Sequence, residues 1–345
     1  MDTIRLFRTK EGKLSLPKEA TIPDAIVATV GTFDGVHRGH QFLFDDLLSK
    51  ARETNLPSAV ITFDRPPVAT VCPSRPYYQI NDAEERAYYL SLLAIDYLFI
   101  LPFDRLLADL STEEFLSHLL FDLLHVHYLV SGYDNRFGKK KEGETECNVE
   151  TLCNQLGMLY HRSSPAYDEK GREYSSSLVR QLLIEGKVKE GAALLGYPYT
   201  LIGKVVGGSK LGRKFGFPTA NIEPSEDHKL IPLKGVYAAW AAWLDEKGEL
   251  HSHQGMLYIG NRPSISSKLE PRIEINLFDF SGDLYGKRLC IALLDYVRGD
   301  VRFENTDHLV EQLKRDETTI RELLLQASDP FLQSTGGLLT TRVKV

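Results

Sequence analysis

The pattern of the sequence changes near residue 200, and this change restricts the fold more than any other feature. Before it, segments of helical spacing such as 43–51 and 115–124 alternate with short apolar runs, at residues 25–30, 58–63, 97–101 and 128–131. A short continuous apolar run is typical of a strand buried on both faces. Strand–helix alternation therefore predicts an α/β domain with a doubly wound, Rossmann-like parallel sheet.

Beyond residue 200, predicted strands follow one another with few helices between them, at residues 202–206, 236–244, 272–280 and 289–297. This spacing favours an antiparallel barrel or sandwich. One amphipathic helix is predicted from about Thr306. A helix-like stretch, 178–195, joins the two patterns, and we place the domain boundary within it, giving domains of residues 1–185 and 186–345.

The length and composition agree with two globular domains. The 345 residues are 43% hydrophobic and 26% charged, with a net charge of −6. Residues 1–185 carry 20 basic and 27 acidic side chains, and residues 186–345 carry 21 and 20. Neither part has the positive excess that nucleic-acid binding requires, whereas a small anionic ligand needs only a local positive site.

The four cysteines lack a C-x-x-C pair, which argues against a zinc ribbon or a disulfide scaffold. The N-terminus has no apolar core of a signal peptide, and no stretch of 18 apolar residues occurs. We therefore expect a soluble cytoplasmic protein without a membrane partner.

The most informative segment is GTFDGVHRGH, residues 31–40, between a predicted strand and a predicted helix. Glycines there allow close approach to a phosphate, and a helix N-terminus favours anions. His37 and His40 share one face of the first helical turn and can donate to phosphate oxygens. Two alternatives remain open: a capped helix with two solvated histidines, and a metal site, although no third ligand follows nearby.

The whole segment resembles the GxFDGxHxGH signature of the nucleotidylyltransferase superfamily, in the form found in prokaryotic bifunctional riboflavin kinase/FMN adenylyltransferases. The resemblance implies a nucleotidylyltransferase domain in which His37 and His40 are catalytic. It also implies an ATP-binding site that includes Gly31, Thr32, Phe33, Asp34, His37 and His40.

Two further segments are similar to motifs of the same family. Residues 131–138, SGYDNRFG, resemble GxDFRFG, which implies that Asp134 contacts ATP and that Asn135 and Phe137 contact the flavin. Residues 174–180, YSSSLVR, resemble SSTxIR, which implies ATP contacts from Ser176, Ser177 and Arg180. A strand-to-loop turn and a helix N-cap are the plain structural alternatives. Where the family often has F-x-P-H-P, this chain has FDRPP without the histidine.

The C-terminal half contains a glycine-rich segment that ends in GFPTAN, residues 216–221. This ending resembles the GFPTAN motif of riboflavin kinases and implies a kinase barrel. In the family the threonine hydroxyl and the asparagine amide oxygen help to hold Mg²⁺, which implies Thr219 and Asn221 as metal ligands here. The implied ATP-binding residues are Gly203, Gly208, Gly212, Gly216, Pro218, Thr219 and Asn221.

Residues 272–278, RIEINLF, alternate apolar and polar side chains as a strand does. An acid in such a strand is commonly a solvated outward residue, but the resemblance implies that Glu274 is the general base for the ribityl 5′-hydroxyl. Asn276 stands where the family often has histidine, which bears on flavin contacts. The motifs GVY, GNRPS, LYG and RGDVRF also match, and they imply flavin contacts from Tyr237 and Arg298.

The resemblance thus implies a bifunctional flavin cofactor enzyme. The C-terminal domain would phosphorylate riboflavin to FMN, and the N-terminal domain would adenylylate FMN to FAD with release of pyrophosphate. Mg²⁺ and ATP are implied for both steps, and the protein is expected to be a monomer or a weak homo-oligomer. Two alternatives stay open: adenylylation or cytidylylation of another phosphate ester, and a flavin-binding or regulatory protein that has lost one or both activities.

Overall fold

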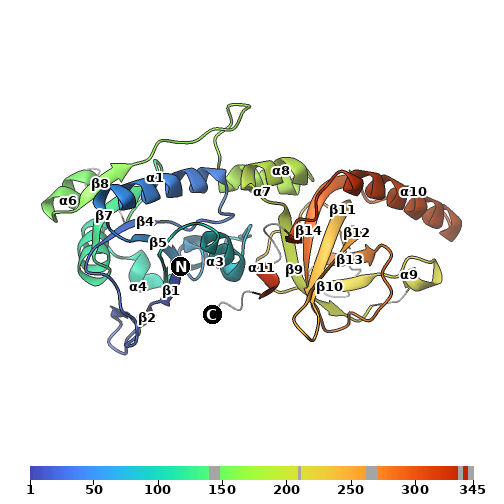
Figure 1. Cartoon of the computed structure of the whole chain (residues 1–345), viewed down its shortest axis with the longest axis horizontal. Helices are drawn as coiled ribbons and strands as arrows, with labels where there is room; N and C mark the ends of the chain where they lie inside the picture. Colours follow the sequence, from blue (N-terminus) through green and yellow to red (C-terminus); the bar gives the residue numbers. More distant parts are fainter. Residues whose placement is uncertain (140–147, 209–210, 262–270, 333–336, 341–345) are drawn as a thin grey trace. The chain divides into compact units, whose positions relative to one another are not determined.

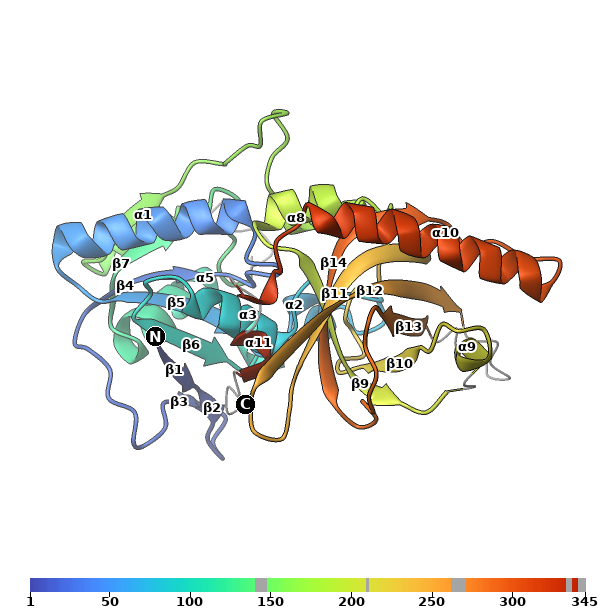
Figure 2. The same cartoon turned by 45° about the vertical axis from the view of Figure 1, so that its right-hand side comes forward.

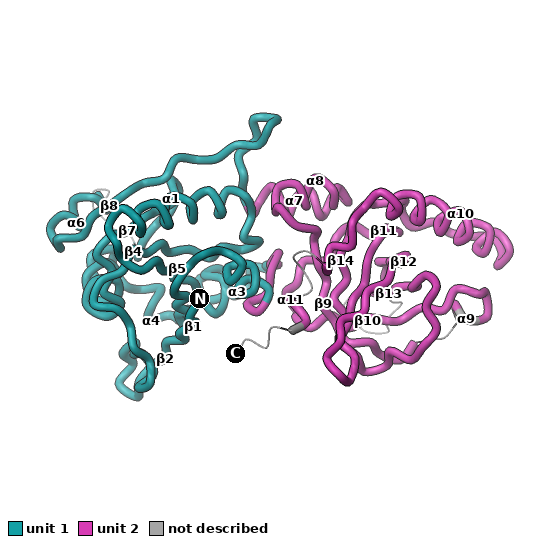
Figure 3. The backbone as a smooth tube through the Cα atoms, viewed as in Figure 1, with its two compact units in different colours: residues 1–77, 85–175 teal, residues 78–84, 176–345 magenta. Residues whose placement is uncertain are grey.

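The computed structural model describes residues 1–139, 148–208, 211–261, 271–332 and 337–340. Cys147 and the residues 262–264 of the GNRPS motif lie outside these ranges. The described chain divides into two compact units, residues 1–77 with 85–175 and residues 78–84 with 176–345 (Figure 3). The division falls at Ser175/Ser176, ten residues before the domain boundary expected at 185/186, which stays a prediction.

The first unit is built on a parallel sheet, as the strand–helix alternation predicts. Six parallel strands are hydrogen-bonded in the order β1-β6-β5-β4-β7-β8 (Figure 1). Their bounds are β1 Asp2–Arg5, β4 Ile26–Val30, β5 Ser58–Phe63, β6 Tyr97–Leu101, β7 Val126–Ser131 and β8 Leu159–Arg162. The sequence did not predict β1 and β8, because both are edge strands with polar, partly exposed residues and no apolar run.

The chain order places the switch point of this sheet at β4. From β4 the chain builds β5 and β6 on one side, and then returns to add β7 on the other side of β4. In doubly wound sheets, ligands bind beyond the carboxyl ends of the strands at such a point. Gly31 and Gly132 directly follow β4 and β7, so the segments that they open lie at this position.

Helices cover the sheet of the first unit. Helix α1 (Arg38–Thr54) buries Leu43, Phe44, Leu47 and Ala51 and packs against β4, β5 and β7 (Figure 1). The helix predicted at 115–124 is a π-helix, η1 (Phe115–Leu123), whose apolar side chains join the core that contains Ile26 and Val30. The remaining elements are β2 Phe7–Arg8, β3 Leu14–Ser15, α2 Pro67–Val71, α3 Ala83–Ser91, α4 Arg105–Ala108, α5 Thr112–Glu114 and α6 Val149–Gln155.

The second unit contains a closed antiparallel barrel in the order β10-β13-β12-β11-β14-β9. The strands are β9 Tyr199–Val206, β10 Ala220–Pro224, β11 Gly235–Leu244, β12 Leu250–Asn261, β13 Pro271–Leu277 and β14 Arg288–Arg298. The sequence did not predict β10 or β12. β10 is short and lies within the glycine- and proline-rich motif, and β12 begins with a run of polar residues.

Helix α10 (Thr306–Leu325) covers one side of the barrel (Figure 2). Its Ile320 and Leu324 pack with Ala238 and Met256 of the barrel wall. The other helices of this unit are α7 Ser176–Ile184, α8 Val188–Leu195, α9 Leu211–Lys214 and α11 Gly337–Thr340. Among the described helices, none is both long and apolar enough to span a membrane.

The segment 78–84 belongs to the second unit although it lies early in the chain. Gln79 forms a parallel bridge with Lys229, and the buried Lys229 ammonium donates a hydrogen bond of 2.7 Å to the carbonyl of Ile80. Glu84 forms an ion pair of 2.8 Å with Arg288 of β14. No sequence pattern indicated that this segment joins the second unit, because Lys229 lies 149 positions from Ile80 and Arg288 lies 204 positions from Glu84.

Candidate functional site

The loop between β4 and α1 has a strained backbone. Phe33 and Val36 have φ angles of 47° and 38°, in the left-handed region that favours glycine. Val36 is β-branched, so this conformation is especially costly for it. The Phe33 ring lies over Gly31, because a Cβ on Gly31 would come within 2.8 Å of it. Asp34 is buried, so this loop presents its backbone more than its acidic side chain.

His37 and His40 form a stacked pair at the start of α1. Their ring centroids are 3.7 Å apart, with an angle of 18° between the ring planes. His37 is the N-cap, and its Nδ1 accepts a hydrogen bond of 3.3 Å from the backbone N–H of His40. Because Nδ1 accepts, the proton of the neutral His37 ring is on Nε2. The Nε2–H of His37 is therefore a donor on the side of the ring that does not face the helix N-terminus.

The His40 ring is held in its neutral form. Burial lowers its pKa well below the ordinary value, and the neighbouring His37 adds to this effect. The edge contact with Phe33, at 5.3 Å between centroids, packs the ring on an apolar surface. Although His40 as a whole is half-buried, its Nδ1 is buried and meets no hydrogen-bonding partner among the described residues. A buried polar atom without a partner is a place where a ligand group is expected.

We expect the His40 imidazole to titrate below pH 6.5 in the folded protein. Since its folded pKa lies below that of the unfolded chain, the unfolded chain binds more protons, and the free energy of unfolding should decrease as the pH falls below 6.5. Imidazole ¹⁵N NMR, with H40Q to assign the signal, measures the titration directly. A midpoint at or above pH 6.5 would contradict the described environment of the ring.

The loop after β7 lies beside the loop after β4. Asn135 donates a hydrogen bond of 2.7 Å from Nδ2 to the carbonyl of Val30, the last residue of β4. Asp134 is exposed at this edge, as a ligand-contacting carboxylate can be. Phe137 is instead buried in the core, where its ring lies 6.0 Å from that of Phe115. The structure therefore brings Asp134 and Asn135 to the strand ends and gives Phe137 a packing role.

The serine-rich segment is divided between the two units. Gly39 of α1 lies against Tyr174, since a Cβ on Gly39 would come within 2.7 Å of the Tyr174 Cβ. Ser176, Ser177 and Arg180 begin α7 in the second unit, where Arg180 donates a hydrogen bond of 3.2 Å to the carbonyl of Tyr78. Their contribution to the ATP site stays a prediction.

The FDRPP loop has an internal structural role. Asp64 Oδ1 accepts a hydrogen bond of 2.9 Å from the backbone N–H of Phe103. The Arg65 side chain is 61% exposed and contacts the Asp64 carboxylate at 3.5 Å. An exposed side chain with one weak contact is not held in place, so the described geometry assigns no ligand contact to Arg65.

In the barrel, two predicted site residues face each other across neighbouring strands. The register of β10 and β13 pairs Asn221 with Glu274, and the register of β12 and β13 pairs Tyr258 with Glu274. Cross-strand partners of this kind share one face of the sheet. Asn221 and Glu274 are each only 8% exposed, so Glu274 is not a solvated outward residue.

The Glu274 carboxylate is fixed on one side. Arg272 Nε and Nη2 each lie 2.8 Å from Oε1 of Glu274. No hydrogen bond reaches Oε2 from the described residues. The Tyr258 hydroxyl donates to Asp300 at 3.2 Å, and burial, followed by Asp300, raises the pKa of Tyr258. The arrangement leaves one carboxylate oxygen of Glu274 available to accept a proton.

A cavity of about 440 Å³ opens beside the GFPTAN motif. Pro218 and Thr219 line one part of it, and residues 280–285 line another. The sequence reasoning missed most of this second segment, since it used only Tyr285 as part of a motif match. Its sequence, FSGDLY, offers a signal: an aromatic residue and a tyrosine flank small and polar residues directly after a strand.

The Asn221 amide lies where a side chain at position 208 would be, so this position requires glycine. A Cβ on Gly208 would lie 2.1 Å from Nδ2 of Asn221, and a Cβ on Gly212 would lie 2.2 Å from the carbonyl oxygen of Phe217. Gly203 packs in the same way against Glu223 of β10. These glycines bring the segment before GFPTAN close to the motif; Gly216, with a φ of 81°, lies within it.

We expect Gly208→Ala to reduce the activity of the barrel site about 10-fold or more, because the added methyl group must displace the buried Asn221 amide. Gly207→Ala is the matched control, since a Cβ there meets nothing within 4 Å. The measurement is the rate of FMN formation from riboflavin. Equal rates for the two variants would contradict the close packing on Asn221.

The two residues predicted to contact a flavin in the barrel have other partners. Tyr237 is fully buried, its hydroxyl donates to the carbonyl of Leu233, and burial raises its pKa. Arg298 forms an ion pair of 2.7 Å with the buried Asp316 of α10. These contacts show packing and helix anchoring, and direct flavin contact stays a prediction for both.

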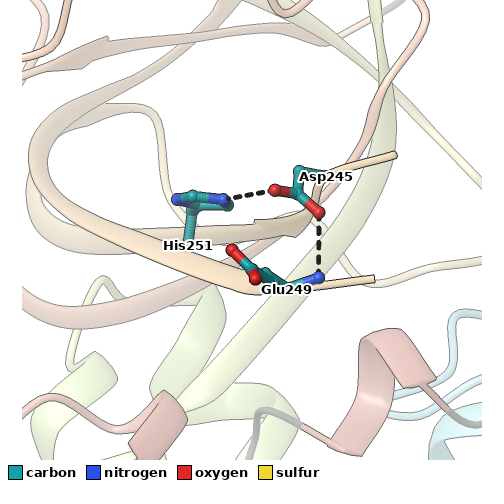
Figure 4. A group of neighbouring side chains, drawn as sticks. All are labelled: Asp245, Glu249 and His251. Atoms are coloured by element: carbon teal, nitrogen blue, oxygen red, sulfur yellow. Dashed lines mark hydrogen bonds and ion pairs between the residues drawn. The ribbon is translucent and has the colours of Figure 1, made fainter. Parts of the chain in front are cut away.

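A third cluster of polar side chains lies at the turn between β11 and β12 (Figure 4). Asp245, Glu249 and His251 place ligand-type atoms within 4.8 Å of one another. The Asp245 carboxylate accepts from His251 Nε2 at 3.0 Å and from the backbone N–H of Glu249, and these bonds lower its pKa to about 2. Asp245 is already hydrogen-bonded within the turn, so we assign this cluster a role in stabilising the hairpin between β11 and β12.

Comparison with known proteins assigns both parts of the chain to described families. The family model described as FAD synthetase matches residues 19–178, and the one described as riboflavin kinase matches residues 195–324. The curated bifunctional riboflavin kinase/FMN adenylyltransferase of Escherichia coli is 36% identical over 302 residues, which cover 87% of this chain and 93% of that protein. This chain belongs to the family of bifunctional riboflavin kinase/FMN adenylyltransferases.

Other members support the same assignment. The Listeria monocytogenes enzyme of this family is 33% identical and is covered to 94% of its length, and the Bacillus subtilis enzyme is 32% identical and covered to 90%. A crystal structure titled as a macrolide-efflux protein from Streptococcus pneumoniae has a TM-score of 0.79 and 31% identity, with 93% of this chain and 99% of that chain covered. The efflux activity is named for that protein alone and is not assigned to this chain.

Proposed function

We propose that this chain makes flavin cofactors in two consecutive steps. The barrel phosphorylates riboflavin to FMN with ATP, and the first unit adenylylates FMN to FAD with release of pyrophosphate. The observation that carries the proposal is the presence, in one chain, of a stacked imidazole pair at a sheet switch point and a buried Asn221–Glu274 pair on neighbouring barrel strands. The family matches cover both units.

For the kinase step, we assign Glu274 as the general base. Its Oε2 accepts the proton of the riboflavin 5′-hydroxyl as that oxygen attacks the γ-phosphorus of ATP, and ADP leaves. Arg272 holds Oε1 and so keeps the carboxylate in one orientation. The cavity beside Thr219 is large enough for the nucleoside part of ATP. The glycines before GFPTAN supply closely approaching backbone for the phosphates.

The donor chemistry around Asn221 fits a magnesium ion. The Thr219 hydroxyl and the Asn221 amide carbonyl are the hard oxygen donors that Mg²⁺ prefers. The lack of a side chain at Gly208 lets the Asn221 amide keep its position, since a Cβ there would lie 2.8 Å from Oδ1 of Asn221. When bound, Mg²⁺ would neutralise charge on the phosphates, while Thr219 and Asn221 fix their position relative to Glu274.

For the adenylyl transfer, we assign His37 and His40 as donors to the reacting phosphate. A phosphate oxygen of FMN attacks the α-phosphorus of ATP, the bond to the β-phosphate breaks, and pyrophosphate leaves. The Nε2–H of His37 and the neutral ring of His40 stabilise the charge that develops on the phosphate oxygens. The N-terminus of α1 adds a positive dipole end at the same place.

The remaining binding roles are part of the same proposal. In the ATP site of the first unit we include Gly31–Asp34, Asp134, Ser176, Ser177 and Arg180. We include Asn135 among the flavin contacts, and we expect Phe137, Tyr237 and Arg298 to act mainly through packing and anchoring. We further propose that the protein works in the cytoplasm as a monomer or weak homo-oligomer, without nucleic-acid or membrane partners.

The direct test is incubation of the purified chain with riboflavin, ATP and Mg²⁺, followed by chromatography of the products. We expect FMN and ADP first, and then FAD and pyrophosphate. Formation of neither FMN nor FAD would overturn the proposal. Binding of FMN or FAD without consumption of ATP would instead support a flavin-binding module, which no finding described above favours.

A further inference from the structure

We propose that Asn276 is a positioning residue for the Thr219–Asn221 pair, and that it acts on MgATP rather than on the flavin. Asn276 lies on β13, two residues after Glu274, and is 6% exposed. Its Nδ2 donates a hydrogen bond of 2.7 Å to the carbonyl of Pro218. The inference rests on the proposed riboflavin kinase activity. It gives Asn276 a role in binding MgATP, whereas the family resemblance linked this position to flavin contacts.

The ladder between β10 and β13 explains why this bond matters. The ladder of β10 with β13 ends at the pair Ala220–Ile275. Thr219 and Asn276, the next residue on each side, are not paired in this ladder. Pro218 has no N–H, so the backbone cannot continue the ladder in the ordinary way. The Asn276 side chain instead links this segment to β13 by donating to the Pro218 carbonyl. It therefore holds the extended segment just before β10 against β13.

Thr219 lies between two fixed points as a result. On one side Pro218 is tied to Asn276, and on the other side Asn221 is paired in register with Glu274. Residues 219 and 221 of an extended chain share one face, so both proposed metal ligands depend on the alignment of this segment. Without the Asn276 bond, the segment would keep its covalent attachment to β10 and the anchor of the preceding Phe217, which is buried and donates to the Gly212 carbonyl, but it would lose its side-chain link to β13.

The chemistry of the side chain provides a matched set of variants. A carbonyl can only accept, so the group at position 276 must donate. In Asn276→Asp the shape is kept, but a carboxylate oxygen replaces the donor and faces the Pro218 carbonyl. In Asn276→His the Nδ1 atom occupies the same branch position as Nδ2 of asparagine and can carry a proton. The first variant removes the bond, and the second restores it.

The test measures steady-state kinetics of FMN formation in the full chain. For Asn276→Asp we expect the KM for MgATP to rise about 10-fold, the change that corresponds to one lost buried hydrogen bond, with the KM for riboflavin within 2-fold. Asn276→His should have a KM for MgATP within about 3-fold of the unchanged chain. MgADP should also raise the Tm of Asn276→Asp less than that of Asn276→His, a readout that needs no turnover.

Each outcome decides between the hypotheses. If the unchanged chain forms no FMN, the proposed function fails and this inference fails with it. If the unchanged chain forms FMN but Asn276→Asp keeps its KM for MgATP, or if Asn276→His loses as much as Asn276→Asp, only the inference is overturned. Should Asn276→Asp also lose FAD formation from FMN and therefore be misfolded, Asn276→Leu replaces it, and an unchanged KM for MgATP in that variant overturns the inference.

Discussion

Replacement of both His37 and His40 by alanine should reduce FAD formation from FMN by at least about 100-fold. The two rings are stacked at 3.7 Å at the N-terminus of α1, where we propose that they donate to the phosphate that is attacked. Formation of FMN from riboflavin should stay within 2-fold, because the Glu274 site belongs to the other compact unit. The two rates are measured separately by supplying either FMN or riboflavin with ATP and Mg²⁺.

The control for this experiment is His118→Ala. His118 lies in the same unit, but its side chain is 74% exposed and, among the described residues, pairs with the exposed Asp122. This variant should keep both rates. Loss of FMN formation together with FAD formation in a folded double variant would refute the division of labour between the units, and full FAD formation would refute the role of the imidazole pair.

Substitution of Glu274 by glutamine should have the reverse effect. Glutamine keeps the shape and a contact to Arg272, but it cannot accept the proton of the riboflavin hydroxyl. We therefore expect kcat for FMN formation to fall by a factor of about 10² to 10⁴, with a smaller change in the KM for riboflavin. FAD formation from supplied FMN should be retained, which also shows that the variant is folded.

Glu223→Gln is the matched control for the Glu274 variant. Glu223 lies on the neighbouring strand β10 but is exposed, so the same change there should leave kcat within 2-fold. If Glu274→Gln keeps more than about a tenth of the kinase rate, another group must take the proton. In that case Glu274 would serve to hold Arg272 rather than to act as the base.

Strand β13 carries three polar residues of the proposed kinase site. Arg272, Glu274 and Asn276 alternate along β13, so all three project from the same face of the strand. Arg272 fixes one oxygen of Glu274, and Asn276 is bonded to the segment that carries the proposed metal ligands. The position of Glu274 relative to the proposed metal ligands is thus set by the register of β10 and β13.

Local patterns were sufficient for the architecture. Four buried runs with intervening helical spacing predicted the parallel sheet, and closely spaced strands after residue 200 predicted the antiparallel region. Both are confirmed, because the period of apolar residues is a local property of the chain. The edge strands β1 and β8, and the strands β10 and β12, were missed. β1 and β8 are polar and β10 lies in turn-rich sequence, while the polar start of β12 hides its later apolar run, so pairing with neighbouring strands defines all four.

Contacts between distant residues could not be read from these patterns. The bond from Asn135 to Val30 joins positions 105 apart, and the bond from Asn276 to Pro218 joins positions 58 apart. The same applies to the ion pair of Arg298 with Asp316 on α10, which no motif indicated, while the flavin contact of Arg298 stays a prediction. Such partners are chosen by packing, which brings together segments with no common sequence signal.

The sequence by itself determined the fold class, the order of the two domain types and the chemical types of the site residues, because periodicity and motif spacing are encoded along the chain. Only the tertiary structure decided that His40 is neutral, that Glu274 is buried opposite Asn221, and that Asn276 holds the Pro218 carbonyl. These properties arise from desolvation and from strand register, and both depend on which distant residues the folded chain brings into contact.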